Sequence, residues 1–224
     1  LASFKKFFGI YNFGSMTMNS LVTCLGSMII CTVFSCLAGY GVTRFNFKGK
    51  KSFLGFLLVT QMFPSVMLVV PFYSMLTKYH MTNTLFGLII VYAATNIAFS
   101  TWMMTSYFKT IPTELDEAAR VDGANSFTIF WKIILPLLKP AIVTSMVLKG
   151  VGVYNEYYCA SLYLQDKRTL GVVATSLYTF TGPLGSKYNL ICAGVLMSLL
   201  PALIVFLLCQ KQIYSGITSG AVKG

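Results

Sequence analysis

The chain has 224 residues, of which 56% are hydrophobic and only 10% are charged. A soluble domain carries roughly 25% charged residues, so this composition excludes a water-soluble globular protein and indicates a lipid bilayer as the solvent. The net charge of +11 does not indicate a nucleic-acid-binding protein, because the basic residues stand singly or in short groups between apolar runs instead of forming one cluster.

Five apolar runs are each long enough to cross a hydrocarbon core, which takes about 20 helical residues. Runs this continuous fit helices and not the alternating pattern of membrane β-strands. We therefore expect an all-α membrane protein, a polytopic helical bundle that forms a single domain over residues 1–224. The expected spans run from Asn19 to Gly41, Ser52 to Leu76, Leu85 to Phe108, Ala141 to Leu164 and Tyr188 to Gln210.

Prolines fall inside two of these runs, with Pro64 and Pro71 in the second and Pro201 in the fifth. Each proline removes a backbone hydrogen bond and favours a kink. A kink can line a cavity of a transporter, or it can be a bend that neighbouring helices compensate. The sequence favours neither alternative.

Basic residues set the expected orientation in the membrane. The first short loop has four cations and no acid: Arg44, Lys48, Lys50 and Lys51. The positive-inside rule makes this loop cytoplasmic, and alternation then places residues 109–139 and the C-terminal tail, residues 210–224, in the cytoplasm as well. The N-terminus then lies outside. Because the chain begins at Leu1 and not at a methionine, we expect a further span ahead of it.

Most of the acidic residues gather in the loop between the third and fourth runs: Glu114, Asp116, Glu117 and Asp122. Pro112 fits the first turn of a short helix, and acidic residues in the first turns suit the helix dipole. Gly123 can adopt the left-handed conformation that ends a helix. Within this helix, Asp116 and Arg120 have the spacing of an i, i+4 ion pair.

A second short helix, residues 127–135, is predicted after the glycine, with Asn125 or Ser126 as its N-cap. Its apolar stripe suits the edge of the bilayer and consists of Phe127, Phe130, Trp131 and Ile134. Two stiff helices at the membrane surface can dock a soluble partner, with Ala118 and Ala119 as a small flat face. The alternative is a solvated loop that only connects two spans.

The fourth run has two ionisable residues, Lys149 and Glu156, which are seven positions apart and would share a helix face. Ionisable groups within a span usually face protein or water. Aromatic, amide and carboxylate groups are suited to binding a sugar, and the alternative is an interfacial aromatic belt with a solvated acid. The candidates for lining a substrate path are Tyr154, Asn155 and Glu156, together with Asn96 and Gln61, for which an interhelical hydrogen bond is the alternative.

The acidic loop also matches a known signature. Residues 117–119 read Glu-Ala-Ala and are followed, after three residues, by Gly123 and, after nine more, by the Ile-x-Leu-Pro of residues 133–136. This pattern resembles the EAA motif in the membrane subunits of bacterial ABC importers. Four further stretches resemble the maltose-type carbohydrate-uptake branch: residues 19–20, 44–49, 106–112 and 220–224. Tyr154 departs from the tryptophan that such permeases often have before Asn-Glu.

The resemblance implies a permease subunit of the type I ABC importer kind, in the bacterial cytoplasmic membrane, with six spans of which five are visible here. It implies a heterodimer with a second permease, two cytoplasmic ATPase subunits, an extracytoplasmic solute-binding protein and a sugar as cargo, most simply an oligosaccharide. The loop helix would enter a cleft of an ATPase subunit and couple ATPase closure to alternating access. The implied coupling residues are Glu114, Leu115, Glu117, Ala118, Ala119, Arg120, Asp122 and Gly123. The tail would also approach the ATPase.

We expect no enzymatic activity in the chain itself, because it has no P-loop and its lone His80 has no catalytic partner in the sequence. We expect no cofactor or metal here, with ATP and Mg²⁺ in the partner ATPase. The six cysteines lie in or beside apolar runs without paired CxxC spacing. Two alternatives stay open: an ABC permease for a non-sugar solute, and a self-sufficient secondary transporter, which needs intramembrane acids where only Glu156 is available. A membrane enzyme would need a catalytic cluster.

Overall fold

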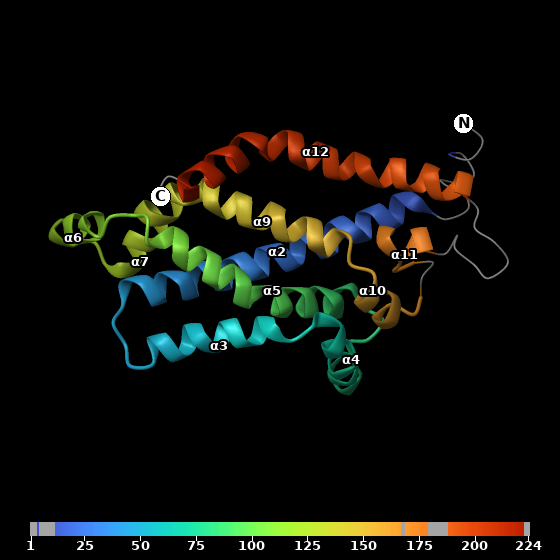
Figure 1. Ribbon diagram of the computed structural model, residues 1–224, viewed down its shortest axis with the longest axis horizontal. Coiled ribbons are helices and arrows are strands. Elements are labelled where there is room, and N and C mark those ends of the chain that lie inside the picture. Colours follow the sequence, from blue (N-terminus) through green and yellow to red (C-terminus); the bar gives the residue numbers. More distant parts are fainter. Residues whose placement is uncertain (1–3, 5–11, 167–168, 179–187, 222–224) are drawn as a thin grey trace. The chain divides into compact units, whose positions relative to one another are not determined.

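The computed structural model describes residues 4, 12–166, 169–178 and 188–221, with side chains described as far as Tyr214. All regular elements in these residues are helices (Figure 1). Three of them are long and apolar enough to cross a membrane: α2 (Phe13–Arg44), α5 (Leu85–Phe108) and the Tyr188–Tyr214 part of α12 (Tyr188–Ala221). Two bent helix pairs bring the total to as many as five spans, which confirms the all-α membrane class.

The second expected span is broken in two by proline. Helix α3 (Lys50–Met62) ends before Pro64, and a 3-10 helix η1 (Ser65–Leu68) then leads into α4 (Val69–Lys78). Phe63 is extended, with φ −76° and ψ 124°, because a residue that precedes proline is pushed out of the helical region. Pro71 lies in the first turn of α4, where a missing N–H costs little.

The fourth expected span ends ten residues early. Helix α9 (Lys139–Tyr154) stops at Tyr154, and a separate short helix, α10 (Tyr158–Tyr163), follows. The N-terminus of α10 is capped by the side chain of Glu156, which accepts the backbone N–H of Cys159 at 3.0 Å. The prediction that Lys149 and Glu156 share one helix face is therefore wrong, because Glu156 lies beyond the end of α9.

The contacts divide the chain into two compact units. The first unit comprises residues 1–28, 64–95 and 149–207, and the second comprises residues 29–63, 96–148 and 208–224. Helices α2, α5, α9 and α12 each contribute one part to each unit. The expected boundaries of the single domain stay a prediction.

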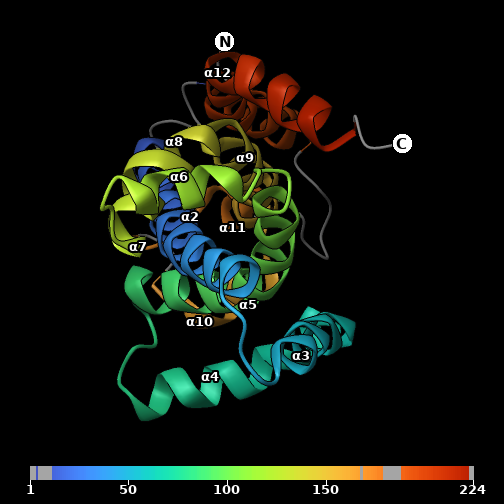
Figure 2. The ribbon, with the colours of Figure 1, turned by 90° about the vertical axis from the view of Figure 1, so that its left-hand side faces the viewer.

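The core of the second unit forms where α2 and α5 meet the short helices of the acidic loop (Figure 2). Tyr40 of α2 is at its centre, with its ring centroid 5.9 Å from that of Phe108 and 4.9 Å from that of Phe130. Gly39 lets α2 and α5 approach closely, since a Cβ at this position would lie 3.0 Å from the Phe108 ring. The acidic loop is thus packed into the unit and does not project freely from it.

The first unit is fastened by hydrogen bonds from spans to connecting segments. Ser20 of α2 accepts the N–H of Val173 at 2.8 Å, at the start of α11 (Val173–Tyr178). The hydroxyl of Tyr163 in α10 donates to the carbonyl of Val69 at 2.7 Å, at the start of α4. These bonds hold α10 and α11 against the ends of longer helices.

Candidate functional site

The acidic loop folds as two short helical segments around a glycine turn. Helix α6 (Glu114–Val121) is followed by α7 (Ser126–Thr128), the π-helix η2 (Ile129–Ile134) and α8 (Leu135–Leu137). The predicted order of helix, turn and second helix is thus confirmed, but Pro112 precedes α6 and does not lie in its first turn as predicted, because Thr113 is the N-cap. Asn125 and not Ser126 is the cap, since its side-chain oxygen accepts the N–H of Thr128 at 2.8 Å.

Gly123 ends α6 in the left-handed conformation, with φ +82°. Its N–H donates to the carbonyl of Arg120 at 3.0 Å, and the N–H of Ala124 donates to the carbonyl of Ala119 at 2.9 Å. This pair of bonds is the Schellman motif, which satisfies carbonyls that the helix end would otherwise leave open. The turn therefore has a defined geometry that fixes the direction of α6 relative to the segment that follows it.

Helix α6 has an inner side and an outer side. Asp116 and Ala119 are buried, with 5% and 7% of their surface exposed, and Ala119 belongs to the core of the second unit. The predicted flat face of Ala118 and Ala119 is therefore wrong, because Ala118 is exposed and Ala119 points inward. The other implied coupling residues are all exposed: Glu114, Leu115, Glu117, Arg120, Asp122 and Gly123.

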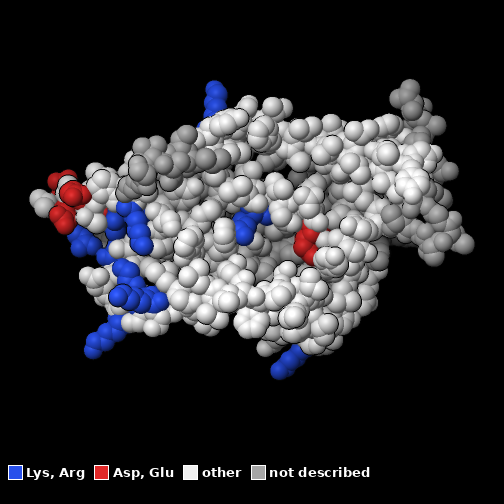
Figure 3. Space-filling view, in the orientation of Figure 1, with Lys and Arg blue, Asp and Glu red and all other residues white. Residues whose placement is uncertain are grey.

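The outer side of α6 carries one apolar residue that the sequence reasoning missed. Val121 is 88% exposed, which is the largest exposed fraction among the large hydrophobic residues that the structure describes. Leu115 is 40% exposed on the same short helix. The i, i+3, i+6 spacing of Leu115, Ala118 and Val121 is a sequence signal that points to this side. Acidic side chains gather over α6 on the face shown in Figure 3, with basic side chains beside them.

Asp116 pairs across the chain and not along its own helix. Its Oδ2 lies 3.0 Å from Nε of Arg44, the last residue of α2, whereas Arg120 is exposed. The predicted i, i+4 pair of Asp116 with Arg120 is replaced by this long-range pair.

The apolar stripe of the second loop helix divides between two environments. Phe130 and Ile134 are 3% and 0% exposed and pack in the core of the second unit. Phe127 and Trp131 are 68% and 50% exposed. The prediction of one stripe at the bilayer edge is therefore wrong, because two of its four residues are buried in the core. Of these four residues, only Phe127 and Trp131 are exposed and could contact the bilayer edge.

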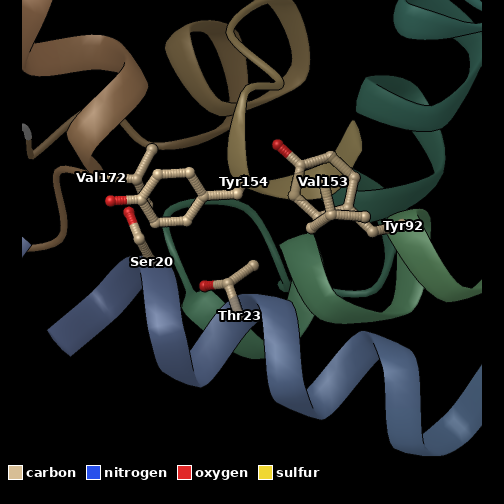
Figure 4. Close-up of a pocket in the computed structure, with 6 residues that line it drawn as sticks. All are labelled: Ser20, Thr23, Tyr92, Val153, Tyr154 and Val172. Atoms are coloured by element: carbon tan, nitrogen blue, oxygen red, sulfur yellow. The ribbon is translucent and has the colours of Figure 1, made fainter. Parts of the chain in front are cut away.

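A small cavity lies in the first unit, lined by Ser20, Thr23, Tyr92, Val153, Tyr154 and Val172 (Figure 4). Thr23 points from α2 into the space between the two tyrosines (Figure 4). Its hydroxyl is buried and has no hydrogen-bond partner among the described residues. The hydroxyl of Tyr154 donates to the carbonyl of Ser198 at 3.1 Å. Of the predicted substrate-path residues, only Tyr154 lines this cavity.

The carboxylate of Glu156 is held by hydrogen bonds. Its Oε2 accepts the hydroxyl of Tyr92 at 2.5 Å, and its oxygens also accept the N–H groups of Cys159 and Ala160. Tyr92 joins both the cavity and this carboxylate, and sequence reasoning missed it because one tyrosine in an apolar span gives no signal of its own.

The remaining substrate-path candidates lie elsewhere. The Asn155 side chain is exposed and donates to the carbonyl of Val151 at 2.9 Å. Gln61 is exposed on α3, and Asn96 is half-buried on α5, both in the second unit. The residues that the structure brings together in the first unit are therefore Tyr92, Tyr154 and Glu156.

Comparison with known proteins adds findings of three kinds, from a family model, from two relatives and from a solved structure. A family model described as "Binding-protein-dependent transport system inner membrane component" matches residues 31–211. The chain is 37% identical to the probable ABC transporter permease protein YurM of Bacillus subtilis, over 98% of this chain and 74% of that protein. It is 34% identical to the maltodextrin transport system permease protein MalD of Streptococcus pneumoniae, over 99% of this chain and 80% of that protein. The fold matches a chain of a bacterial ABC transporter that imports alginate with a TM-score of 0.81 at 24% identity, covering 93% of this chain and 78% of that one.

Proposed function

This chain belongs to the family of binding-protein-dependent transport system inner membrane components, and from that membership we propose that it is the permease subunit of an ATP-driven importer of oligosaccharides. It is a membrane protein and a transport subunit, and not itself an enzyme. ATP hydrolysis takes place in a separate subunit. The similarity to a maltodextrin permease over 99% of the chain supports the sugar cargo.

The observation that carries the proposal is the outer side of α6. Exposed apolar side chains at Leu115, Ala118 and Val121 offer a contact surface, and the acidic residues Glu117 and Asp122 lie at its rim. Apolar centres with charged rims are typical of protein interfaces. A cleft in a cytoplasmic ATPase subunit with basic groups at its edge would complement this helix.

The way α6 is attached to the protein supports coupling. The connection between α6 and the spans must be stiff if a movement of the ATPase is to be transmitted to the spans. The Schellman turn at Gly123 and the burial of Ala119 in the core with Tyr40 and Phe130 provide this stiffness. ATPase closure would therefore displace α6 together with the parts of α2 and α5 in the second unit.

The proposed assembly contains a second permease, two ATPase subunits that bind ATP and Mg²⁺, and an extracytoplasmic binding protein that delivers the sugar. Loop residues 109–139 and the C-terminal residues 210–224 would be cytoplasmic. In the first unit, Tyr154, with Tyr92 and Glu156 beside it, would face the sugar once the path opens, since the space between the two rings has room for about one water molecule.

The proposal is tested by reconstituting the complete complex in proteoliposomes with the binding protein and labelled maltodextrin. We expect uptake that requires ATP, and ATP hydrolysis that rises when the loaded binding protein is added. Uptake by the permease without an ATPase would show a secondary carrier. Stimulation by a non-carbohydrate solute, with none by oligosaccharides, would show the non-sugar alternative.

Replacing Tyr154 with alanine should lower maltodextrin uptake roughly tenfold, the equivalent of about 1.4 kcal/mol, because it removes an aromatic wall of the cavity. Glu156→Gln keeps a hydrogen-bond acceptor at the start of α10 but removes the charge, and it should lower uptake less. Initial uptake rates at several sugar concentrations measure both effects.

The matched control is Tyr158→Ala, which removes an aromatic residue that is 61% exposed on α10 and does not line the cavity. All three variants should retain the ATPase during purification. If Tyr154→Ala and Tyr158→Ala take up sugar with the same kinetics, Tyr154 does not belong to the substrate path.

A further inference from the structure

Two charged residues that are far apart in the sequence form a buried pair beneath α6. Nε of Arg44 lies 3.0 Å from Oδ2 of Asp116, and the two side chains are only 6% and 7% exposed. A second guanidinium nitrogen of Arg44, Nη2, donates to the carbonyl of Ile111 at 3.0 Å. Arg44 therefore holds both α6 and the backbone that leads into it.

Burial gives this pair a role in geometry. Separating two charges that have left water costs far more than keeping them together, since either partner alone would be an uncompensated buried charge. Asp116 lies on the inner side of α6 with Ala119, and Val121 lies on the outer side. The pair can therefore fix α6 without blocking the surface that is proposed to meet the ATPase.

The same end of α2 also contacts the second helix of the loop. Tyr40, one turn before Arg44, packs its ring against Phe130 and directs its hydroxyl to the carbonyl of Ser126 at 3.4 Å. Arg44 joins α2 to α6, and Tyr40 joins α2 to the segment after the glycine turn. Both halves of the loop are thus anchored on the last turns of one span.

We propose that Arg44 and Asp116 are positioning residues for coupling, an inference that rests on the proposed function. They lock α6 to the end of α2, so that a displacement of α6 by the ATPase moves this span. The competing role for Arg44 is a cytoplasmic charge that sets topology, as the positive-inside rule predicts. The exposed Lys48, in the same loop, would serve that role equally well and has no part in the lock.

The test is a double-mutant cycle in the assembled transporter with Arg44→Met, Asp116→Leu and the double variant, and with Lys48→Gln as the control. Each single variant leaves one buried charge unpaired, whereas the double variant replaces the pair with apolar groups of similar size, an exchange that buried pairs often tolerate. Two quantities are measured on purified complexes: maltodextrin uptake per ATP hydrolysed, and hydrogen–deuterium exchange of the backbone over residues 114–123.

We expect each single variant to lower uptake per ATP at least about tenfold and to speed exchange over residues 114–123, while the double variant recovers most of both. Lys48→Gln should behave like the wild type. Losses that simply add in the double variant, unchanged exchange in the single variants, or an equal loss in Lys48→Gln would each overturn the lock. Absence of ATP-driven uptake by the wild type would overturn the proposed function instead, and the exchange data would still decide the role of the pair.

Discussion

Replacing Val121 with aspartate is expected to detach the ATPase from the permease while the permease stays folded. Val121 is 88% exposed, so its side chain contributes almost nothing to the core. In the proposed complex it lies at the apolar centre of the contact surface, with Glu117 and Asp122 at the rim. A new carboxylate there would be desolvated beside two acidic residues, and we expect this repulsion to cost about 2 kcal/mol of binding free energy, roughly a thirtyfold loss of affinity.

Co-purification of the ATPase and titration of its binding to the permease measure this effect. Val121→Ile is the matched control, because it keeps an apolar side chain of similar shape at the same position. The thermal stability of the isolated permease should be equal in both variants. If Val121→Asp retains the ATPase with wild-type affinity, the outer side of α6 is not the docking surface.

Replacing Gly123 with valine should uncouple ATP hydrolysis from uptake. The residue has φ +82°, and no heavy atom lies within 4 Å of the position that a Cβ would take, so the side chain itself has room. The expected damage is conformational: the left-handed region costs an L-residue about 1–2 kcal/mol, and a β-branched residue is least tolerated. Relief of this strain would open the Schellman turn and change the direction of α6.

Asparagine is the informative comparison at this position, because it visits the left-handed region more readily than other residues that have a side chain. We expect uptake per ATP to fall roughly tenfold in Gly123→Val, corresponding to about 1.4 kcal/mol, and only slightly in Gly123→Asn. Both rates are measured on the same proteoliposomes. Equal behaviour of the two variants would show that the left-handed turn is not required for coupling.

Features of the acidic loop with local causes could be predicted from the sequence. The first helix, its end at Gly123 and a cap at either Asn125 or Ser126 depend on residues within a few positions of one another, and the structure confirms the helix and its end and selects Asn125. The kink expected at Pro64 also has a local cause, since proline restricts both itself and the preceding residue, but the structure shows a complete break between α3 and η1 instead of a kink.

Features that depend on distant contacts could not be predicted in this way. Asp116 has a suitably spaced partner in Arg120, yet it pairs with Arg44, which is 72 positions away and which nothing in the sequence indicates as a partner of Asp116. The end of α9 depends on the side chain of Glu156, which caps a new helix and binds Tyr92. An apolar run gives no indication that a carboxylate within it will interrupt the helix.

The anchoring of both loop helices on the last turns of α2 has a consequence for protein engineering. A chimera could receive residues 109–139 from another permease so that it binds the ATPase of that permease. The foreign acidic helix would then have to pack against Arg44 and Tyr40 of the original chain. Such a graft should work only if the final turns of α2 are transplanted with it. A natural exchange of ATPases between transport systems would meet the same requirement. The last turns of α2 and residues 109–139 would therefore have to change together, although they are separated in the sequence.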